Sequence, residues 1–197
     1  MPLAVVTGAS SGIGAATAKL LAESGFEVIA AARRLDRLEK IAAANSSITA
    51  MHLDVTDQKS VDAFAAALSG KSVAVLVNNA GGAFDSAPIE KSDPETWQKT
   101  YEVNVIGSLR ITKALLPNLR ANGKSHIVVV TSTAGHAVYE NGGSYTNAKF
   151  AELAFTQTLR LELNGEPIRI TEIAPGMVMT EERSEEHTSE LQSHLNL

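Results

Sequence analysis

The most chemically specific residues in this sequence are a tyrosine and a lysine four positions apart, Tyr145 and Lys149. Residues at i and i+4 of a helix lie on one face, so the lysine ammonium can lie beside the tyrosine phenol. A phenol ordinarily releases its proton near pH 10, and proton transfer near neutrality requires a change of roughly 4 kcal/mol. A fixed neighbouring cation supplies much of that change. Because this spacing is common on helices, it does not establish catalysis alone.

Two further motifs accompany the pair. Ser132 precedes Tyr145 by thirteen residues, and the chain opens on a glycine-rich segment, Thr7-Gly-Ala-Ser-Ser-Gly-Ile-Gly14. Gly8 allows a tight turn out of the strand, and Gly12 allows the backbone to approach a pyrophosphate. Gly14 allows close packing of the helix. A phosphate there meets free amides and the positive end of a helix. The segment indicates a dinucleotide site, although glycine-rich turns also occur for structural reasons.

Short β-branched or apolar runs alternate with longer segments rich in alanine, leucine and charge. The short runs predict strands at Leu3–Thr7, Glu27–Ala32, Ile48–Leu53, Val73–Val77, His126–Thr131 and Ile168–Ile173. The longer segments predict helices at Ile13–Ser24, Arg34–Ala44, Gln58–Leu68, Pro94–Ala121 and Ser144–Asn164, with N-caps at Asp57 and Asp93. The alternation predicts an α/β fold, a doubly wound parallel sheet of the Rossmann type. The motifs fall at the carboxyl ends of strands, where such sheets bind ligands.

The end of the second predicted strand carries Ala32-Arg33-Arg34. A dinucleotide fold that prefers NAD places an acidic residue there for the ribose 2′-hydroxyl. A cation suits a 2′-phosphate instead, and arginine can bind it through two hydrogen bonds. The sequence therefore favours NADP(H) over NAD(H). The alternative is that both arginines are solvated at a helix start, paired with Asp36 or Glu39.

The composition argues against several classes of protein. The chain has 197 residues, no cysteine and a net charge of −5. Five glutamates against Arg183 place −4 of this charge after Thr180, so the body is nearly neutral, which argues against nucleic-acid binding. The five histidines show no ligand spacing, so we expect no metal. With neither a signal-like N-terminus nor a long apolar run, we expect a soluble, cytoplasmic protein without membrane contact.

Together, the motifs across residues 3–180 resemble the short-chain dehydrogenase/reductase family. They are the glycine-rich segment, Leu53-Asp-Val, Asn78-Asn-Ala-Gly, Asn104, Ser132, Tyr145, Lys149 and Pro175-Gly. The segments around Ser132, Tyr145 and Pro175 are most similar to the NADP-dependent 3-hydroxy acid (serine-type) dehydrogenase branch. The resemblance implies an NADP(H)-dependent oxidoreductase that interconverts a hydroxyl and a carbonyl on a small molecule, with a 3-hydroxy acid as the candidate substrate. It also implies a homodimer or homotetramer.

The resemblance implies a role for each site residue. Asp54 faces the adenine with Val55 along it, Asn79 to Gly81 pass under the adenosine ribose, and Val178 and Thr180 bracket the nicotinamide amide. The implied cofactor-binding residues are Thr7, Gly8, Ser10, Ser11, Gly12, Ile13, Gly14, Arg33, Arg34, Asp54, Val55, Asn79, Ala80, Gly81, Tyr145, Lys149, Pro175, Gly176, Val178 and Thr180.

The implied catalytic residues are Asn104, Ser132, Tyr145 and Lys149. Ser132 would bond the substrate oxygen, and Tyr145 would give or take the proton. Lys149 would favour the phenolate and bind the nicotinamide ribose. Asn104 would hold a water that links Lys149 to solvent, while a helix asparagine bonded to backbone is the alternative.

Residues 183–194 are similar to an in-frame translation of a sequencing adapter, and the alternative is an ordinary acidic tail. On the first interpretation, residues 1–182 form the dinucleotide-binding and catalytic domain, C-terminally truncated before the family's substrate loop, helix and last strand. Residues 183–197 are then a non-native tail. On this interpretation we expect the oxidoreductase activity in the parent protein and expect the 197-residue chain itself to be inactive; the alternative function is thus a remnant that at most binds cofactor.

Overall fold

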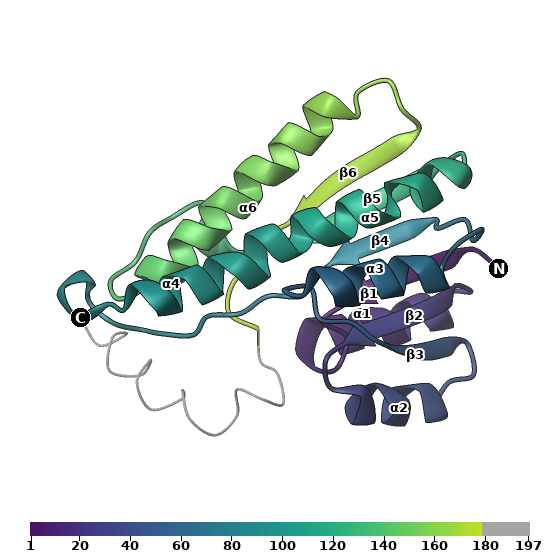
Figure 1. The fold of residues 1–197 in the computed structure, drawn as a ribbon, viewed down its shortest axis with the longest axis horizontal. Helices are drawn as coiled ribbons and strands as arrows, with labels where there is room; N and C mark the ends of the chain where they lie inside the picture. The colour runs from purple at the N-terminus through teal and green to yellow at the C-terminus, as the bar shows by residue number, and fades with distance from the viewer. Residues whose placement is uncertain (179–197) are drawn as a thin grey trace.

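The computed structural model describes residues 1–178, which form one parallel sheet with helices on both faces (Figure 1). The strand order is β3-β2-β1-β4-β5-β6, and every neighbouring pair is parallel. The strand bounds are β1 Leu3–Thr7, β2 Glu27–Ala32, β3 Ile48–His52, β4 Val75–Asn78, β5 Ser125–Val130 and β6 Ile168–Ile173. The predicted doubly wound α/β fold is confirmed, and the predicted strands are displaced by two residues at most.

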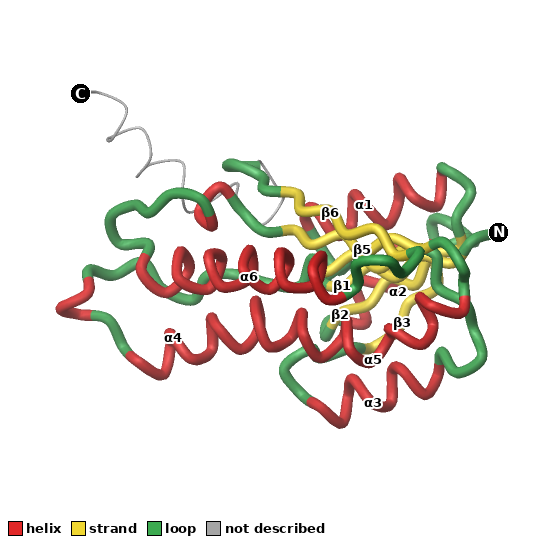
Figure 2. The backbone as a smooth tube through the Cα atoms, turned by 90° about the horizontal axis from the view of Figure 1, so that it is seen from above, coloured by secondary structure: helices red, strands yellow, loops and turns green. Residues whose placement is uncertain are grey.

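Helices cover the sheet on both sides. Their bounds are α1 Gly12–Glu23, α2 Leu35–Ala43, α3 Gln58–Ala67, α4 Pro94–Tyr101, α5 Gly107–Ala121 and α6 Gly143–Glu162. Figure 2 shows α1 on one side of the sheet and α3 and α5 on the other. Two apolar clusters fill the layers, one built on Ala18 and Leu38 from α1 and α2 and the other on Phe64, Leu115 and Leu159 from α3, α5 and α6. A chain in which strand and helix alternate produces this three-layer packing.

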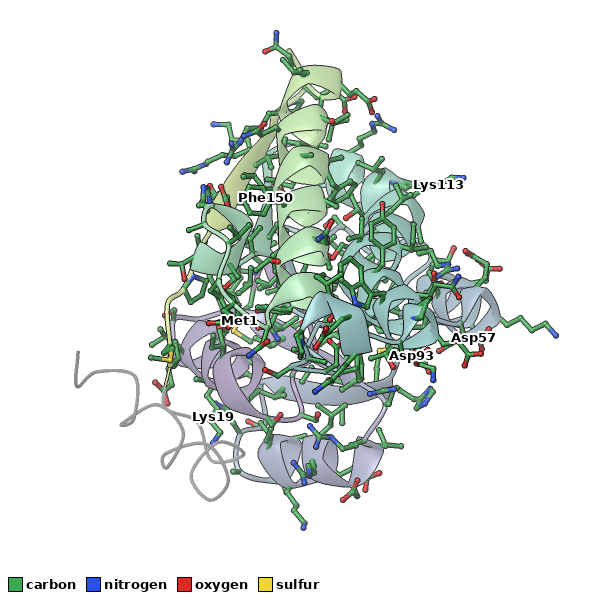
Figure 3. All side chains as sticks on the ribbon, turned by 90° about the vertical axis from the view of Figure 1, so that its left-hand side faces the viewer. Met1, Lys19, Asp57, Asp93, Lys113 and Phe150 are labelled. Carbon is green, nitrogen blue, oxygen red and sulfur yellow. The ribbon has the colours of Figure 1, made fainter. Side chains whose placement is uncertain are left out.

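Two predicted N-caps are confirmed. The Asp57 carboxylate accepts a hydrogen bond from the Lys59 amide, and the Asp93 carboxylate accepts from the amides of Glu95 and Thr96 (Figure 3). These bonds satisfy amides that a helix leaves without an internal partner at its first turn. The caps therefore fix where α3 and α4 begin.

The single helix predicted over Pro94–Ala121 is wrong in its middle. A π-helical segment at Glu102–Ile106 separates α4 from α5. The prediction rested on the spacing of apolar residues. That spacing does not distinguish a π-helical turn from an α-helical turn within one continuous helix. Inside the segment, the buried Asn104 carboxamide bonds the backbone of Gly82, a contact that helix propensity does not encode. Segments of this kind are frequent at functional sites.

The last two strands are joined by side chains as well as backbone. His126 Nε2 on β5 lies 2.8 Å from Thr171 Oγ1 on β6. Burial, with a smaller contribution from the positive charge of Arg169, lowers the pKa of His126 below its usual value of 6.5. Among residues 1–178, no helix is long and apolar enough to cross a membrane, and no group of three or more potential metal ligands occurs.

Candidate active site

A cavity of about 570 Å³ lies at the carboxyl ends of the strands. It runs from the glycine-rich loop after β1 and the end of β2, past the ends of β3 and β4, to the segments that follow β5 and β6. Its volume is typical of a site for a small molecule or cofactor. The predicted site residues among its lining are Gly8, Ser10, Ser11, Ile13, Arg33, Arg34, Asp54, Val55, Asn79, Ala80, Gly81, Ser132, Tyr145, Lys149, Pro175, Gly176 and Val178.

The loop between β1 and α1 brings backbone to the cavity wall. Gly8 has a φ of +65°, and a Cβ built there would lie 2.8 Å from the Cα of Ala80. A Cβ at Gly14 would overlap the Gly8 carbonyl oxygen and the side-chain amide nitrogen of Asn79. Both positions therefore require glycine, for a left-handed turn and for close packing. The turn directs the N-terminus of α1, with its positive dipole end, toward the cavity.

Thr7 joins the ends of the two central strands instead of lining the cavity. Its buried hydroxyl donates to the Val77 carbonyl at 3.2 Å and accepts from the amides of Asn79 and Ala80, both at 3.0 Å. The Asn79 side-chain amide donates in return to the carbonyls of Thr7 and Gly8, at 2.9 and 3.3 Å. Five hydrogen bonds thus fix the loop after β4 against the loop after β1.

The two arginines after β2 line the cavity in different ways. The Arg34 guanidinium donates to the hydroxyls of Ser10 and Ser11 at 2.9 to 3.2 Å, which places it over the glycine-rich loop. Arg33 is exposed and contributes charge beside Asp54. Although burial raises the pKa of Asp54, hydrogen bonds from Thr56 and the charge of Arg33 outweigh it, and the net pKa lies below the usual value. This end of the cavity therefore holds two cations and an ionised carboxylate.

Another part of the cavity carries three of the four predicted catalytic residues, Ser132, Tyr145 and Lys149. The Ser132 hydroxyl follows β5, where it accepts from the Ala134 amide at 3.1 Å and donates to the Pro175 carbonyl at 3.5 Å. Tyr145 lies in the first turn of α6, and Lys149 Nζ lies 5.7 Å from the centre of its ring. The structure therefore brings the serine, the tyrosine and the lysine to one wall.

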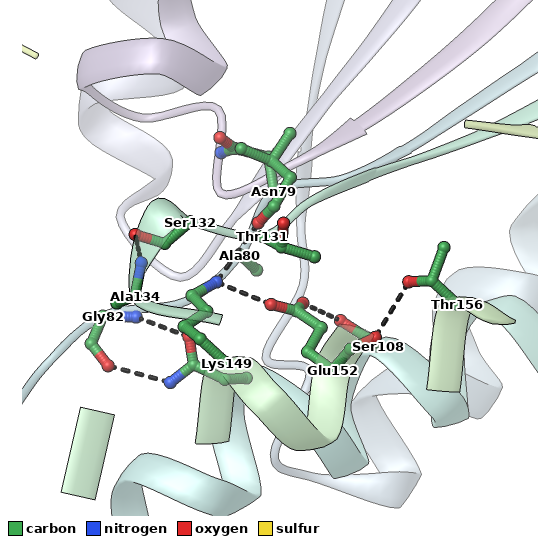
Figure 4. Close-up of polar contacts among 12 residues, drawn as sticks. Asn79, Ala80, Gly82, Ser108, Thr131, Ser132, Ala134, Lys149, Glu152 and Thr156 are labelled. Atoms are coloured by element: carbon green, nitrogen blue, oxygen red, sulfur yellow. Dashed lines mark hydrogen bonds and ion pairs between the residues drawn. The ribbon is translucent and has the colours of Figure 1, made fainter. Parts of the chain in front are cut away.

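Lys149 has a partner that the sequence did not lead us to predict. Its ammonium donates to the Val130 carbonyl at 3.1 Å and to the Glu152 carboxylate at 2.6 Å (Figure 4). The second carboxylate oxygen of Glu152 accepts from the Ser108 hydroxyl on α5 at 3.0 Å. Burial raises the pKa of Glu152, and it outweighs the opposing effects of Lys149 and Ser108. Lysine and glutamate at i and i+3 are common surface pairs, so spacing alone did not signal a buried one.

Asn104 does not line the cavity but holds a loop that does. Its side-chain nitrogen donates to the carbonyls of Thr100 and Gly82, at 2.7 and 2.8 Å, and its oxygen accepts from the Gly82 amide at 3.2 Å. A Cβ at Gly81 would overlap that oxygen and lie 3.5 Å from Lys149 Nζ. The backbone-bonded alternative for Asn104 is thus present. Its contact with a water stays a prediction.

A second polar cluster lies where β5 and β6 end. The Glu172 carboxylate accepts from the Thr131 hydroxyl at 2.6 Å and pairs with His136 Nε2 at 2.8 Å. Burial raises the pKa of Glu172, but these bonds outweigh it, so the pKa lies below its usual value. The cluster joins the loop after Ser132 to the last strand.

Four predicted site residues do not line the cavity within the described part of the chain. Thr7, Gly12, Gly14 and Asn104 support it from behind, whereas Thr180 and the predicted tail at 183–197 lie outside residues 1–178. The cavity also has lining residues that carried no motif, namely Ala31, Ala32, Leu53, Gly82, Phe84, Val103, Val130 and Thr131. Most of these are apolar residues adjacent to strand ends, a position that topology alone could have indicated.

Comparison with known proteins agrees with this geometry. The family profile for short chain dehydrogenases matches residues 2–191. The chain belongs to the short-chain dehydrogenase family. The family predicted from the sequence is therefore confirmed.

Three relatives place this family member more closely. An uncharacterized oxidoreductase of Mycobacterium tuberculosis strain H37Rv is 53% identical over 179 residues, which cover 91% of this chain and 70% of the relative. An NADP-dependent 3-hydroxy acid dehydrogenase of Salmonella typhi is 34% identical over 89% of this chain and 72% of its own length. The closed form of a serine dehydrogenase complexed with NADP+ superposes with a TM-score of 0.86 and 32% identity, covering 91% of this chain and 74% of that structure. These similarities support the predicted branch.

Proposed function

We propose that this protein is an NADP(H)-dependent oxidoreductase that interconverts a hydroxyl and a carbonyl group on a small hydroxy acid. The observation that carries the proposal is the convergence of Ser132, Tyr145 and Lys149 on one wall of the cavity. The names of the relatives, a 3-hydroxy acid dehydrogenase and a serine dehydrogenase, support the substrate class and the cofactor.

The residues of the cavity fit a dinucleotide phosphate along its length. The glycine-rich loop and the N-terminus of α1 would hold the pyrophosphate through backbone amides. Arg33 and Arg34 would bind the 2′-phosphate, and the serine hydroxyls already hold Arg34 over the loop. Asp54 would face the adenine, and Lys149 would bond the nicotinamide ribose. The cofactor would supply or accept the hydride at its nicotinamide ring.

The catalytic steps assigned to the chain are proton transfer and orientation. In oxidation, Tyr145 as phenolate would take the proton of the substrate hydroxyl. A hydride would leave the carbon that bears this hydroxyl and pass to the cofactor. In reduction, its phenol would return that proton to the oxygen. Ser132 would donate a hydrogen bond to the substrate oxygen, and the Lys149 ammonium would stabilise the phenolate. Charge balances in both directions, since one proton and one hydride move together.

The proposal is tested by measuring turnover and NADP(H) binding in the unaltered protein and in two tyrosine variants. We expect NADP(H) to bind the unaltered protein, and we expect oxidation of serine or another 3-hydroxy acid to produce NADPH absorbance. Tyr145→Phe should bind NADP(H) with similar affinity, because the ring still packs, while its kcat falls to a few per cent or less. The exposed Tyr139→Phe is the matched control.

Two results separate the alternatives. Activity retained in Tyr145→Phe would refute the assignment of the proton donor. Cofactor binding without turnover by the unaltered 197-residue chain would instead favour the inactive, cofactor-binding remnant.

A further inference from the structure

Glu152 is a buried carboxylate that the proposed chemistry does not use. Its residue is 1% exposed, and it lies on α6 one turn after Lys149, where its carboxylate faces Ser108 of α5. Figure 4 shows Lys149 and Glu152 pointing toward one another, with Ser108 on the far side of the carboxylate. A buried charge is costly without a partner, so a glutamate at this position requires an explanation.

The two carboxylate oxygens of Glu152 have separate partners. One accepts from Lys149 Nζ at 2.6 Å, and the other accepts from the Ser108 hydroxyl at 3.0 Å. The Glu152 backbone carbonyl accepts from the Thr156 hydroxyl at 2.8 Å, which attaches the same turn to the next one. The carboxylate is therefore fixed in direction by a neutral donor and directs its charge at the ammonium.

Lys149 is bound on two sides by these contacts. Its Nζ lies between the Val130 carbonyl, 3.1 Å away, and the Glu152 carboxylate. The same nitrogen lies beside Gly81 and within 5.7 Å of the Tyr145 ring centre. A lysine side chain has a long flexible stem, so without these acceptors its ammonium would have several positions available.

We propose that Glu152 is a positioning residue for Lys149: held by Ser108, it fixes the lysine ammonium between the Val130 carbonyl and the Tyr145 ring. This inference rests on the proposed function for its catalytic meaning, but the ion pair itself can be tested without turnover. A hydrogen bond between two charged groups is shorter and stronger than one between neutral groups, so this contact holds the ammonium in one place.

The other charged group that faces this pair is Glu172, on β6. Its negative charge opposes ionisation of Glu152, and its own carboxylate is bonded to Thr131 and His136. Among the described residues only the Glu152 carboxylate contacts Lys149, and Glu172 is a second carboxylate near Glu152. Substituting Glu152 removes the contacting charge and leaves the second in place.

The experiment is competitive acetylation of the unaltered 197-residue protein and its variants with acetic anhydride, read by peptide mass spectrometry. Only the neutral amine reacts, and the exposed Lys113 serves as the internal standard, because its side chain extends away from α5 (Figure 3). Glu152→Gln keeps the size of the side chain and an oxygen acceptor but removes the charge. We expect acetylation of Lys149 to rise about tenfold relative to Lys113, because the amine loses a charge-assisted hydrogen bond that holds it away from the reagent.

Two variants make the result specific. Ser108→Ala should raise acetylation of Lys149 by a smaller factor, about twofold to threefold, because the carboxylate keeps its charge but loses its fixed direction. Glu162→Gln, an exposed glutamate at the end of the same helix, should leave it unchanged. Equal labelling of Lys149 in the unaltered protein and in Glu152→Gln would overturn the proposal. If circular dichroism shows that Glu152→Gln does not fold, the test rests on Ser108→Ala. Unchanged acetylation of Lys149 in Ser108→Ala would then overturn the proposal.

Saturating NADP(H) separates this inference from the proposed function. Protection of Lys149 from acetylation by the cofactor is expected if Lys149 binds the nicotinamide ribose. Its absence would count against the proposed function, whereas the comparison of Glu152→Gln with the unaltered protein would still decide the role of Glu152.

Discussion

Replacing Thr7 with valine tests how the two central strands hold the cavity together. Valine has nearly the same shape as threonine but lacks the hydroxyl, and Thr7 is 1% exposed, so packing is retained while hydrogen bonds are lost. Three bonds disappear, one to the Val77 carbonyl and two from the amides of Asn79 and Ala80. At about 1 kcal/mol for each bond, with an added cost for amides left buried without an acceptor, the loss is about 2 to 4 kcal/mol. That is a large part of the 5 to 15 kcal/mol typical of a domain.

The assay is urea unfolding followed by circular dichroism. Thr7→Val should lower the midpoint without changing the slope, since the surface exposed on unfolding stays the same. Thr7→Ser keeps the hydroxyl and should lose less, and Thr49→Val, an exposed threonine on β3, should be close to neutral. NADP(H) affinity should also fall in Thr7→Val, because the loop at Asn79 and Ala80 lines the cavity. A Thr7→Val midpoint equal to that of the unaltered protein would refute the reasoning.

Arg33→Asp should reverse the preference for NADP over NAD, by about tenfold to a hundredfold in kcat/KM, since a charge-assisted bond contributes roughly 1.5 to 3 kcal/mol; an unchanged ratio would leave Arg33 as a surface residue. Gly81→Ala should reduce kcat and NADP(H) affinity, because its methyl would overlap the Asn104 oxygen, whereas Gly82→Ala has open space and should cost less, so equal losses would contradict this account. The lowered pKa of His126 means that the unfolded chain takes up its proton first as pH falls. The contribution of His126 to the free energy of unfolding should be complete above about pH 6.5 and should decline below it, by at most about 1.4 kcal/mol per pH unit. In urea unfolding at a series of pH values, the free energy of unfolding of His126→Gln should decline less steeply. Parallel curves for the two proteins would show that His126 does not contribute.

Sequence patterns predicted the sheet well because its inner strands, such as β1 and β2, are almost fully buried and consist mainly of β-branched or apolar residues. The runs at Leu3–Thr7, Glu27–Ala32 and Ile168–Ile173 agree with the observed strands at both ends. The helix over Pro94–Ala121 shows the limit. Its middle is a π-helical segment whose Asn104 forms hydrogen bonds with Gly82, 22 positions away. Local periodicity contains no information on such a contact.

The candidate site was predictable where a residue type is needed for chemistry or for close approach. Tyr145, Lys149 and the glycine-rich loop belong to this class. Glu152 does not, because its role depends on its burial and on its contact with Ser108 of α5, whereas a glutamate three residues after a lysine usually lies on a solvated face. Thr7 was predicted to contact the cofactor. In the described structure its hydroxyl instead accepts hydrogen bonds from the Asn79 and Ala80 amides, behind the cavity wall.

The π-helical segment at Glu102–Ile106 has a consequence for insertions and deletions. Each residue of an α-helix turns the chain by about 100°, so removing one residue from this segment could restore a continuous α-helix from α4 to α5. The regular helix would have better backbone hydrogen bonds, but Asn104 would point away from the Gly82 backbone and release the loop beside Lys149. A shorter protein could therefore gain stability while losing its site. At this segment, the demands of stability and activity would then oppose each other.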